Sequence, residues 1–215
     1  MGIQSVPGTL GTMPRIRADS IAEHKELTRR QILDAAQELI AEIGSAEISL
    51  GEIASGVGIG RTTLYEYFTD RDDVIASLVE EQLPGVVADL LTGVPSDTTP
   101  ADHLLEVADR TVRFVATDPV LGLILHREVG RLSSQAQQRI RVAHSDLVSE
   151  VDAIFSAGVE DGSLRPLPPD LAGRFIQDTI MSAARAVIAA PDPDVRLPEI
   201  LSAMRTFLLG GLSYP

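Results

Sequence analysis

Hydrophobic positions along the chain recur mostly at steps of three and four residues, which is the period of one face of an α-helix. The first clear run consists of Ile32, Leu33, Ala36, Leu39, Ile40 and Ile43. Thr28 is a candidate N-cap at its start, and Gly44 is a candidate stop at its end. We therefore predict a helix over this run, preceded by a flexible arm over residues 1–26.

Two short helices are predicted next, joined by a turn rich in glycine. Ser49 and Glu52 have the spacing of a capping box, in which each residue's side chain bonds the other's backbone N–H. Gly58 stands where a left-handed conformation would end that helix, and a second helix is expected over residues 61–68. Two short helices with a three-residue turn are typical of a helix-turn-helix.

Longer helices follow in the rest of the chain. Asp70 and Asp73 are spaced to cap a helix that runs to about Leu91. Further helices are predicted over residues 101–116, 119–132, 133–160, 171–190 and 197–209, the last stopped by Gly210-Gly211. No segment shows strand alternation. We predict an all-α fold: an N-terminal three-helix domain with the helix-turn-helix (27–72) and a C-terminal six-helix domain (73–215).

Composition narrows the chemistry. Hydrophobic residues make up 44% of the chain and aromatic residues 4%, so we expect a core of aliphatic side chains between helices. The absence of cysteine excludes disulfides and thiolate chemistry, and the four histidines lack the spacing of a helical metal site. No cofactor or metal is expected. No apolar run approaches the roughly 20 residues that span a bilayer, and we expect a cytoplasmic protein.

The net charge of −13 is unusual for a chain that binds phosphates. The first 80 residues carry seven Lys or Arg against thirteen Asp or Glu. Local basic character remains in one short segment, with Arg15, Arg17, Lys25, Arg29 and Arg30 within sixteen positions. These residues form either a solvated tail or an arm that enters a DNA minor groove. Any DNA binding should be strongly salt-dependent, with a weak affinity for non-specific DNA.

The segment over residues 53–71 carries a recognisable pattern. It consists of an Ile-Ala pair, a glycine at the turn, Thr-Leu-Tyr, one further residue, an aromatic residue, Phe and, three positions later, a basic residue. This segment closely resembles the TetR family of bacterial repressors. Residues 32–44 resemble the first helix of that family, so the resemblance covers roughly residues 27–80.

The resemblance implies a homodimeric repressor that binds a palindromic DNA operator and leaves it when a small-molecule effector binds. The sequence departs from the family pattern at three positions. Gly60 stands where Ser or Thr is usual, Arg71 replaces a usual Lys, and Glu66 adds a negative charge close to where phosphates would lie.

Two residues at the start of the second short helix are predicted to contact bases. Arg61 has the geometry to donate two hydrogen bonds to a guanine, and Thr62 to touch a thymine methyl group. The predicted phosphate contacts are Ser49, Thr63, Tyr65, Tyr67 and Arg71.

Four of the five phosphate contacts have a structural alternative. Tyr65 and Tyr67 are amphipathic and could be half-buried with only their hydroxyl tips in water. Arg71 could instead pair with one of the neighbouring carboxylates, and Ser49 acts first as a helix cap.

The last two predicted helices carry wide apolar stripes. The resemblance implies that they pair with their copies in a four-helix dimer interface, although the stripes could equally pack within one chain. The predicted interface residues are Phe175, Ile180, Ala184, Val187, Leu201, Met204, Phe207 and Leu208.

The resemblance also implies an effector pocket among the middle helices, mostly apolar with a few polar groups. The candidate lining residues are Arg110, Arg113, Phe114, Leu121, His126 and Gln177. For each of them, a surface or structural role is favoured over ligand contact.

Two other functions compete with a repressor. The first is a helical ligand-binding or protein-interaction module without DNA binding, which the acidic balance and Glu66 favour. The second is an all-helical enzyme, but the sequence shows no nucleophile elbow, no phosphate-binding glycine motif and no convergent acid and base. We therefore predict a regulator and no enzymatic activity.

Overall fold

The computed structural model describes residues 15–92 and 98–213, and it describes their side chains except at 15–19, 119, 126, 169 and 170. All regular secondary structure in these ranges is helical, which confirms the predicted all-α fold. The helices are α1 (Arg15–Ile43), α2 (Leu50–Val57), α3 (Arg61–Leu64), α4 (Arg71–Leu91), α5 (Pro100–Thr117), α6 (Pro119–Leu123), the π-helical turn η1 (Ile124–Glu128), the 3-10 turn η2 (Val129–Arg131), α7 (Ser134–Ala143), α8 (Ser145–Glu160), α9 (Pro169–Ile188) and α10 (Pro193–Leu212).

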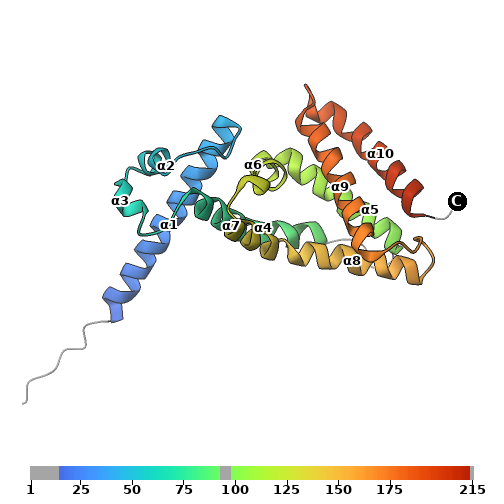
Figure 1. Cartoon of the computed structure of the whole chain (residues 1–215), viewed down its shortest axis with the longest axis horizontal. Coiled ribbons are helices and arrows are strands. Elements are labelled where there is room, and N and C mark those ends of the chain that lie inside the picture. The colour runs from blue at the N-terminus through green and yellow to red at the C-terminus, as the bar shows by residue number, and fades with distance from the viewer. Residues whose placement is uncertain (1–14, 93–97, 214–215) are drawn as a thin grey trace, which may run out of the picture.

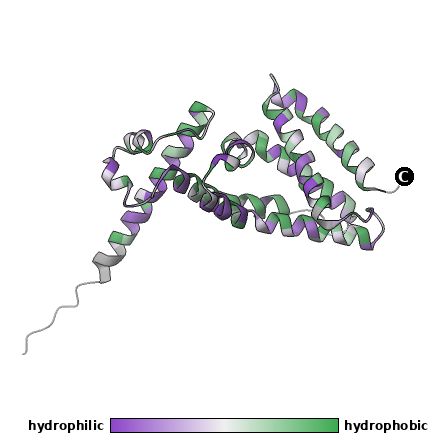
Figure 2. Ribbon diagram, viewed as in Figure 1, coloured by the Kyte–Doolittle hydropathy of each residue, from purple (hydrophilic) through white to green (hydrophobic). Residues whose placement is uncertain are grey.

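The molecule is elongated, with α1–α3 at one end and α9–α10 at the other (Figure 1). Helix α4 follows α3 after a short loop, packs against α1, and runs through the middle, where it packs against α7. Hydrophobic and hydrophilic residues alternate around the helices, as expected when each helix buries one face (Figure 2).

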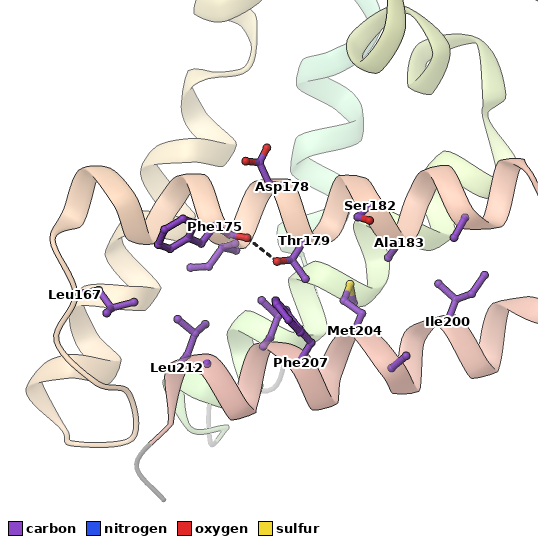
Figure 3. A pocket seen from close by; sticks show the side chains of 15 residues that line it. Leu167, Phe175, Asp178, Thr179, Ser182, Ala183, Ile200, Met204, Phe207 and Leu212 are labelled. Carbon is purple, nitrogen blue, oxygen red and sulfur yellow. Dashed lines mark hydrogen bonds between the residues drawn. The ribbon is translucent and has the colours of Figure 1, made fainter.

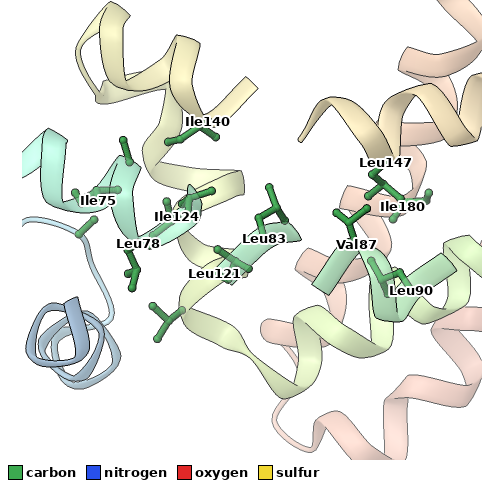
Figure 4. Close-up of a cluster of buried hydrophobic side chains, with 14 of the residues drawn as sticks. Ile75, Leu78, Leu83, Val87, Leu90, Leu121, Ile124, Ile140, Leu147 and Ile180 are labelled. Atoms are coloured by element: carbon green, nitrogen blue, oxygen red, sulfur yellow. The ribbon is translucent and has the colours of Figure 1, made fainter. Parts of the chain in front are cut away.

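A continuous aliphatic core joins the two ends. Helix α4 contributes Ile75, Leu78, Leu83, Val87 and Leu90 to this core, which also includes Leu121, Ile124, Ile140, Leu147 and Ile180 (Figure 4). Because α4 packs against α1 and also against α5 and α7, a shift of the C-terminal helices has a rigid element through which to move the N-terminal end.

The start of α1 differs from the sequence prediction. The helix begins at Arg15 and not near residue 27, so the part of the expected arm that lies in the described residues is helical; residues 1–14 lie outside them. Thr28 is not an N-cap, because it lies inside the helix, where its hydroxyl donates to the carbonyl of His24 at 2.9 Å. The added turns contain Ala, Glu and Lys, which favour helix without needing a buried face. Gly44, with φ of 68°, ends α1 as predicted.

The C-terminal helices also differ from their predicted bounds. The segment expected to be one helix over residues 119–132 divides into α6, η1 and η2, and the next expected helix is interrupted at His144. Gly210-Gly211 does not stop the last helix, which continues to Leu212. The side chain of Arg165 donates to the carbonyls of both glycines, and its backbone N–H donates to Leu212 at 2.6 Å. The last carbonyl groups of a helix have no donor within the helix, and here the distant residue Arg165 supplies their hydrogen bonds.

Candidate nucleic-acid interface and ligand cavities

The first helix of the helix-turn-helix begins at a complete capping box. The Oγ of Ser49 accepts from the backbone N–H of Glu52 at 3.2 Å, and the carboxylate of Glu52 accepts from the N–H of Ser49 at 2.8 Å. The hydrogen bonds from Ser49 lower the pKa of Glu52. The predicted cap is therefore confirmed, and it fixes where α2 starts.

The turn between α2 and α3 depends on one glycine. Gly58 has φ of 76° and ψ of 26°, a left-handed conformation that a side chain would strain. Its N–H bonds the end of α2, and the N–H of Ile59 donates to Ala54 at 3.0 Å. This turn sets α3 across α2, as a helix-turn-helix requires.

Helix α3 is shorter than predicted. Its α-helical part ends at Leu64, and residues 65–67 form turns, although the N–H of Phe68 still donates to Leu64 at 3.1 Å. Leu64 and Phe68 are fully buried and anchor the segment to the core.

The exposed side of α3 carries the predicted base contacts. Arg61 and Thr62 are exposed, and Thr63 is half-buried. The guanidinium of Arg61 lies 5.9 Å from the centre of the Tyr65 ring and donates to its hydroxyl at 3.5 Å. Arg61 and Tyr65 therefore contact each other one helical turn apart, and Arg61 and Thr62 both face solvent.

The predicted phosphate contacts have mixed surroundings. Tyr65 is 49% exposed, whereas Tyr67 is half-buried, with the ammonium of Lys25 5.9 Å from its ring centre. Arg71 pairs with Asp72 at 2.8 Å, the alternative that the sequence left open. Ser49 serves as a cap. Contact of these residues with DNA stays a prediction.

Arg139, which sequence analysis did not single out, joins α7 to the start of α4. Its guanidinium donates to Asp73 at 2.6 Å, to Ser77 at 2.8 Å and to Glu80 at 2.9 Å. Hydrogen bonds to Glu80 and Asp73 raise the pKa of Arg139 further above its usual range. The partners lie some sixty residues away in sequence, so no local pattern indicates this cluster.

A second bond reinforces this link. The carboxylate of Asp72 accepts from the backbone N–H of Ser133 at 2.7 Å, just before α7 begins. Burial tends to raise the pKa of Asp73, but hydrogen bonds from Thr69 and Arg139 outweigh it and lower that pKa. The start of α4, which directly follows α3, is therefore held by α7.

A cavity of about 210 Å³ lies between α5, α8 and α9, and we call it the sensor cavity. Its walls are mostly aliphatic, and its polar lining residues are Thr111, His144, Asp152, Arg174 and Gln177. Burial lowers the pKa of His144, so its ring is neutral at pH 7 and offers one donor and one acceptor. An apolar cavity with a few polar groups suits a small organic ligand.

The candidate effector residues are dispersed in the structure. Gln177 lines the sensor cavity, whereas Leu121 is fully buried and Phe114 is packed against the core. Arg110 pairs with Glu106, and Arg113 is exposed. The side chain of His126 lies outside the described residues.

A larger groove of about 790 Å³ runs between α9 and α10 (Figure 3). Phe175 and Phe207 line it and are 57% and 70% exposed. Met204 and Leu208 also line it, but they are buried. The other predicted interface residues, Ile180, Ala184, Val187 and Leu201, are buried within the subunit.

Neither a metal-ligating cluster nor a membrane-spanning helix is found within residues 15–92 and 98–213. No group of three His, Cys, Asp or Glu residues in residues 15–92 and 98–213 is arranged to hold a metal ion. No described helix is both long enough and apolar enough to cross a bilayer.

Two family models match this chain. Residues 32–78 match the model described as bacterial regulatory proteins, tetR family, and residues 97–185 match the model described as tetracyclin repressor-like, C-terminal domain. Between them they cover both the helix-turn-helix and most of the sensor region.

Related sequences extend over most of the chain. It is 26% identical over 151 residues to the fatty acid metabolism regulator protein of Bacillus subtilis, covering 70% of this chain and 78% of that protein. It is 26% identical over 197 residues to the HTH-type transcriptional repressor KstR2 of Mycobacterium tuberculosis, covering 91% of this chain and 98% of that protein.

Solved structures share the fold. The fatty acid degradation regulator FadR of Bacillus halodurans superposes with a TM-score of 0.69 at 24% identity, covering 85% of this chain and 95% of that one. FadR of Bacillus subtilis in complex with stearoyl-CoA superposes with a TM-score of 0.68 at 23% identity, covering 82% and 97%.

Proposed function

This chain belongs to the TetR family of bacterial regulatory proteins, and on that premise we propose that it is a homodimeric repressor of palindromic operators. It is a DNA-binding transcriptional regulator. We propose that a small effector in the sensor cavity favours the state in which the dimer has left its operator. We further propose that the protein acts in the cytoplasm and has no catalytic role.

The polar face of α3 is the observation that carries DNA binding. Leu64 and Phe68 are buried and anchor this segment to the core, whereas Arg61 and Thr62 are exposed to solvent. A short, rigidly mounted helix with exposed hydrogen-bonding groups at its N-terminus is what a major groove accepts. Arg61 supplies base recognition by a bidentate contact, and Thr62 an apolar contact to thymine.

The groove between α9 and α10 supports dimerisation. Two largely exposed phenylalanines beside a cavity of about 790 Å³ form an apolar surface that a second copy would remove from water. A two-fold dimer would present two copies of α3 to two half-sites, which is why we propose a palindromic operator.

The sensor cavity supports an effector with an apolar body. Its walls are aliphatic, and neutral His144 and Gln177 supply hydrogen bonds for a polar group. One relative is named for fatty acid metabolism, and one structural neighbour holds stearoyl-CoA. We propose an effector that carries an acyl chain or a comparable apolar body.

Coupling would run from the cavity through α7. His144 lines the cavity and separates α7 from α8, and Arg139 on α7 holds the start of α4 beside α3. A ligand that fits the cavity better when α7 is displaced would shift the dimer toward a spacing that the operator does not match.

The test is selection of bound fragments from a random DNA pool at two salt concentrations. We expect enrichment of a palindrome, with affinity falling steeply at the higher salt. Circular dichroism on the same sample establishes that it is folded. Folded protein that enriches no sequence at either salt concentration would replace this function with a ligand-binding or protein-interaction module, which the net charge of −13 favours.

A further inference from the structure

A separate cavity of about 380 Å³ lies where the N-terminal and C-terminal parts meet, and we call it the junction cavity. Its walls come from the end of α1, from α6 and η1, and from the end of α9. The lining residues are Ile40, Ala41, Gly44, Val120, Gly122, Leu123, Arg127, Arg185, Ile188 and Ala189. None of them lines the sensor cavity or the groove between α9 and α10.

Two arginines are the charged residues of this lining. Arg127 lies on η1, and Arg185 lies in the last turn of α9; both are exposed. Across the described side chains, most arginines have a carboxylate partner, but neither of these two makes an ion pair or a hydrogen bond. In a chain with a net charge of −13, these two guanidinium groups give the cavity a local positive charge.

The rest of the lining is apolar. Ile40 and Val120 are buried side chains whose surfaces reach the cavity, and Ile188 leaves 44% of its surface exposed there. Gly122 allows α6 to pack closely against α5, since a Cβ at that position would come within 2.7 Å of the Val115 side chain. An apolar floor with two cations at its edge suits an amphiphile, and the volume falls within the range of about 300–1,000 Å³ typical of ligand sites.

The surroundings limit the number of negative charges. An adjoining hollow shares Ala41 and Val120 with the junction cavity, and its lining includes Asp34, Glu38 and Asp118. These carboxylates would repel a second anionic group that extends in that direction. A ligand with a single anionic head therefore fits better than a polyanion.

We propose that the junction cavity binds an amphiphile with one anionic head, a carboxylate or a phosphate, held between Arg127 and Arg185, with its apolar body against Ile40, Val120 and Ile188. Because one wall belongs to α1 and another to α9, occupancy fixes the DNA-binding end relative to the dimerising end. This second consequence rests on the proposed function, whereas the binding itself does not.

Calorimetric titration of the full-length protein with decanoate tests the site. The double variant Arg127→Gln/Arg185→Gln should weaken decanoate binding by at least about tenfold, because each lost charge-assisted hydrogen bond costs affinity. Arg141→Gln, an exposed arginine on α7, should leave the affinity unchanged, and circular dichroism should show all variants folded.

Arg174 distinguishes the junction cavity from the sensor cavity, which it lines. We expect Arg174→Gln to retain the part of the decanoate binding that Arg127→Gln/Arg185→Gln removes, whatever it does to binding at the sensor cavity. Loss of binding in Arg174→Gln together with normal binding in the double variant would overturn the proposal, since the head would then lie at the sensor cavity.

Three further ligands define the head group. Decyl phosphate and decanoate should both bind the double variant more weakly than the parent protein. Whichever of the two binds the parent protein more tightly identifies the head group as a phosphate or a carboxylate. Decan-1-ol should bind the parent protein and the double variant equally. Coenzyme A, a polyanion, should bind more weakly than decanoate; tighter binding that depends on the two arginines would contradict a single anionic head.

A DNA titration with and without decanoate completes the experiment. We expect decanoate to change the affinity for a selected operator in the parent protein and not in the double variant. If no operator can be selected, the calorimetric arm still decides the site, so failure of the proposed function and failure of the ligand site remain separate results.

Discussion

The two ends of the molecule expose opposite kinds of surface. At the α3 end, Leu64 and Phe68 are buried, and the exposed surface is made by Arg61 and its polar neighbours. At the α9–α10 end, Phe175 and Phe207 are 57% and 70% exposed beside an apolar groove. Exposed polar groups on a rigid helix suit a hydrated, charged partner such as DNA, whereas an exposed apolar groove suits another protein surface.

The molecule contains two kinds of stabilising contact. Caps join residues three positions apart, as Ser49 and Glu52 do in the helix-turn-helix. Ion pairs join distant segments, as Arg29 does with Glu81 at 2.9 Å and Arg205 with Asp109 at 2.8 Å. The hydrogen bond to Asp109 raises the pKa of Arg205. The first kind of contact forms locally, and the second exists only once the chain has folded.

The largest expected effect breaks the apolar end. Phe207→Asp places a charge in the groove, so we expect a monomer whose operator affinity is about 100-fold lower, because the two half-sites are no longer bound together. Sedimentation velocity and operator titration measure both quantities. Val195→Asp is the matched control, since Val195 is also 70% exposed on α10 but does not line the groove. A Phe207→Asp dimer with normal affinity would remove the groove from the dimer interface.

Arg139→Met removes the link between α7 and the start of α4. Asp73 and Glu80 lose their partner, and we expect the free energy of unfolding to fall by about 2–4 kcal/mol, less than for a fully buried pair because the Arg139 side chain is 29% exposed. Urea denaturation measures the change. Arg141→Met, on the exposed side of the same helix, should change stability by under about 0.5 kcal/mol. Equal stability of the two variants would contradict the role assigned to Arg139.

Arg61→Ala tests the polar end. We expect operator affinity to fall by roughly 1–3 kcal/mol, with relaxed preference at one base step, while stability stays unchanged because the side chain is exposed. Arg61→Lys keeps the charge but loses the bidentate geometry, and it should recover affinity more than specificity. Repeating the random-pool selection with each variant gives the answer. An unaltered preference at every base would exclude Arg61 as a specificity residue.

The smallest effect concerns the local cap. Ser49→Ala removes the acceptor for the backbone N–H of Glu52, and it should lower the free energy of unfolding by about 1 kcal/mol. Ser49→Thr keeps a hydroxyl and should retain most of that stability. Thermal denaturation of the three proteins in parallel measures the difference. A larger loss of operator affinity than of stability would support the additional phosphate contact predicted for Ser49.

Much of the fold could be predicted from the sequence alone. The capping box at Ser49, the cap at Asp70 and the left-handed glycines at positions 44 and 58 are all found as predicted. Each involves partners at most four residues apart, so both partners lie within the short sequence segment from which the feature is predicted. The apolar periodicity likewise sufficed for the all-α fold and the helix-turn-helix, because one buried face per helix is enough to produce it.

Tertiary structure decided which apolar residues stay in water and which polar residues meet. The wide stripes of the last two helices did not distinguish Phe207, which is exposed, from Val187, which is buried, because that depends on what packs beside each helix. Likewise, Arg139 contacts partners 59 to 66 residues away, and Arg127 and Arg185 line one cavity whose walls come from separate helices. Sequence periodicity carries the orientation of a side chain on its own helix, whereas burial, ion pairs and cavities require the relative positions of several helices.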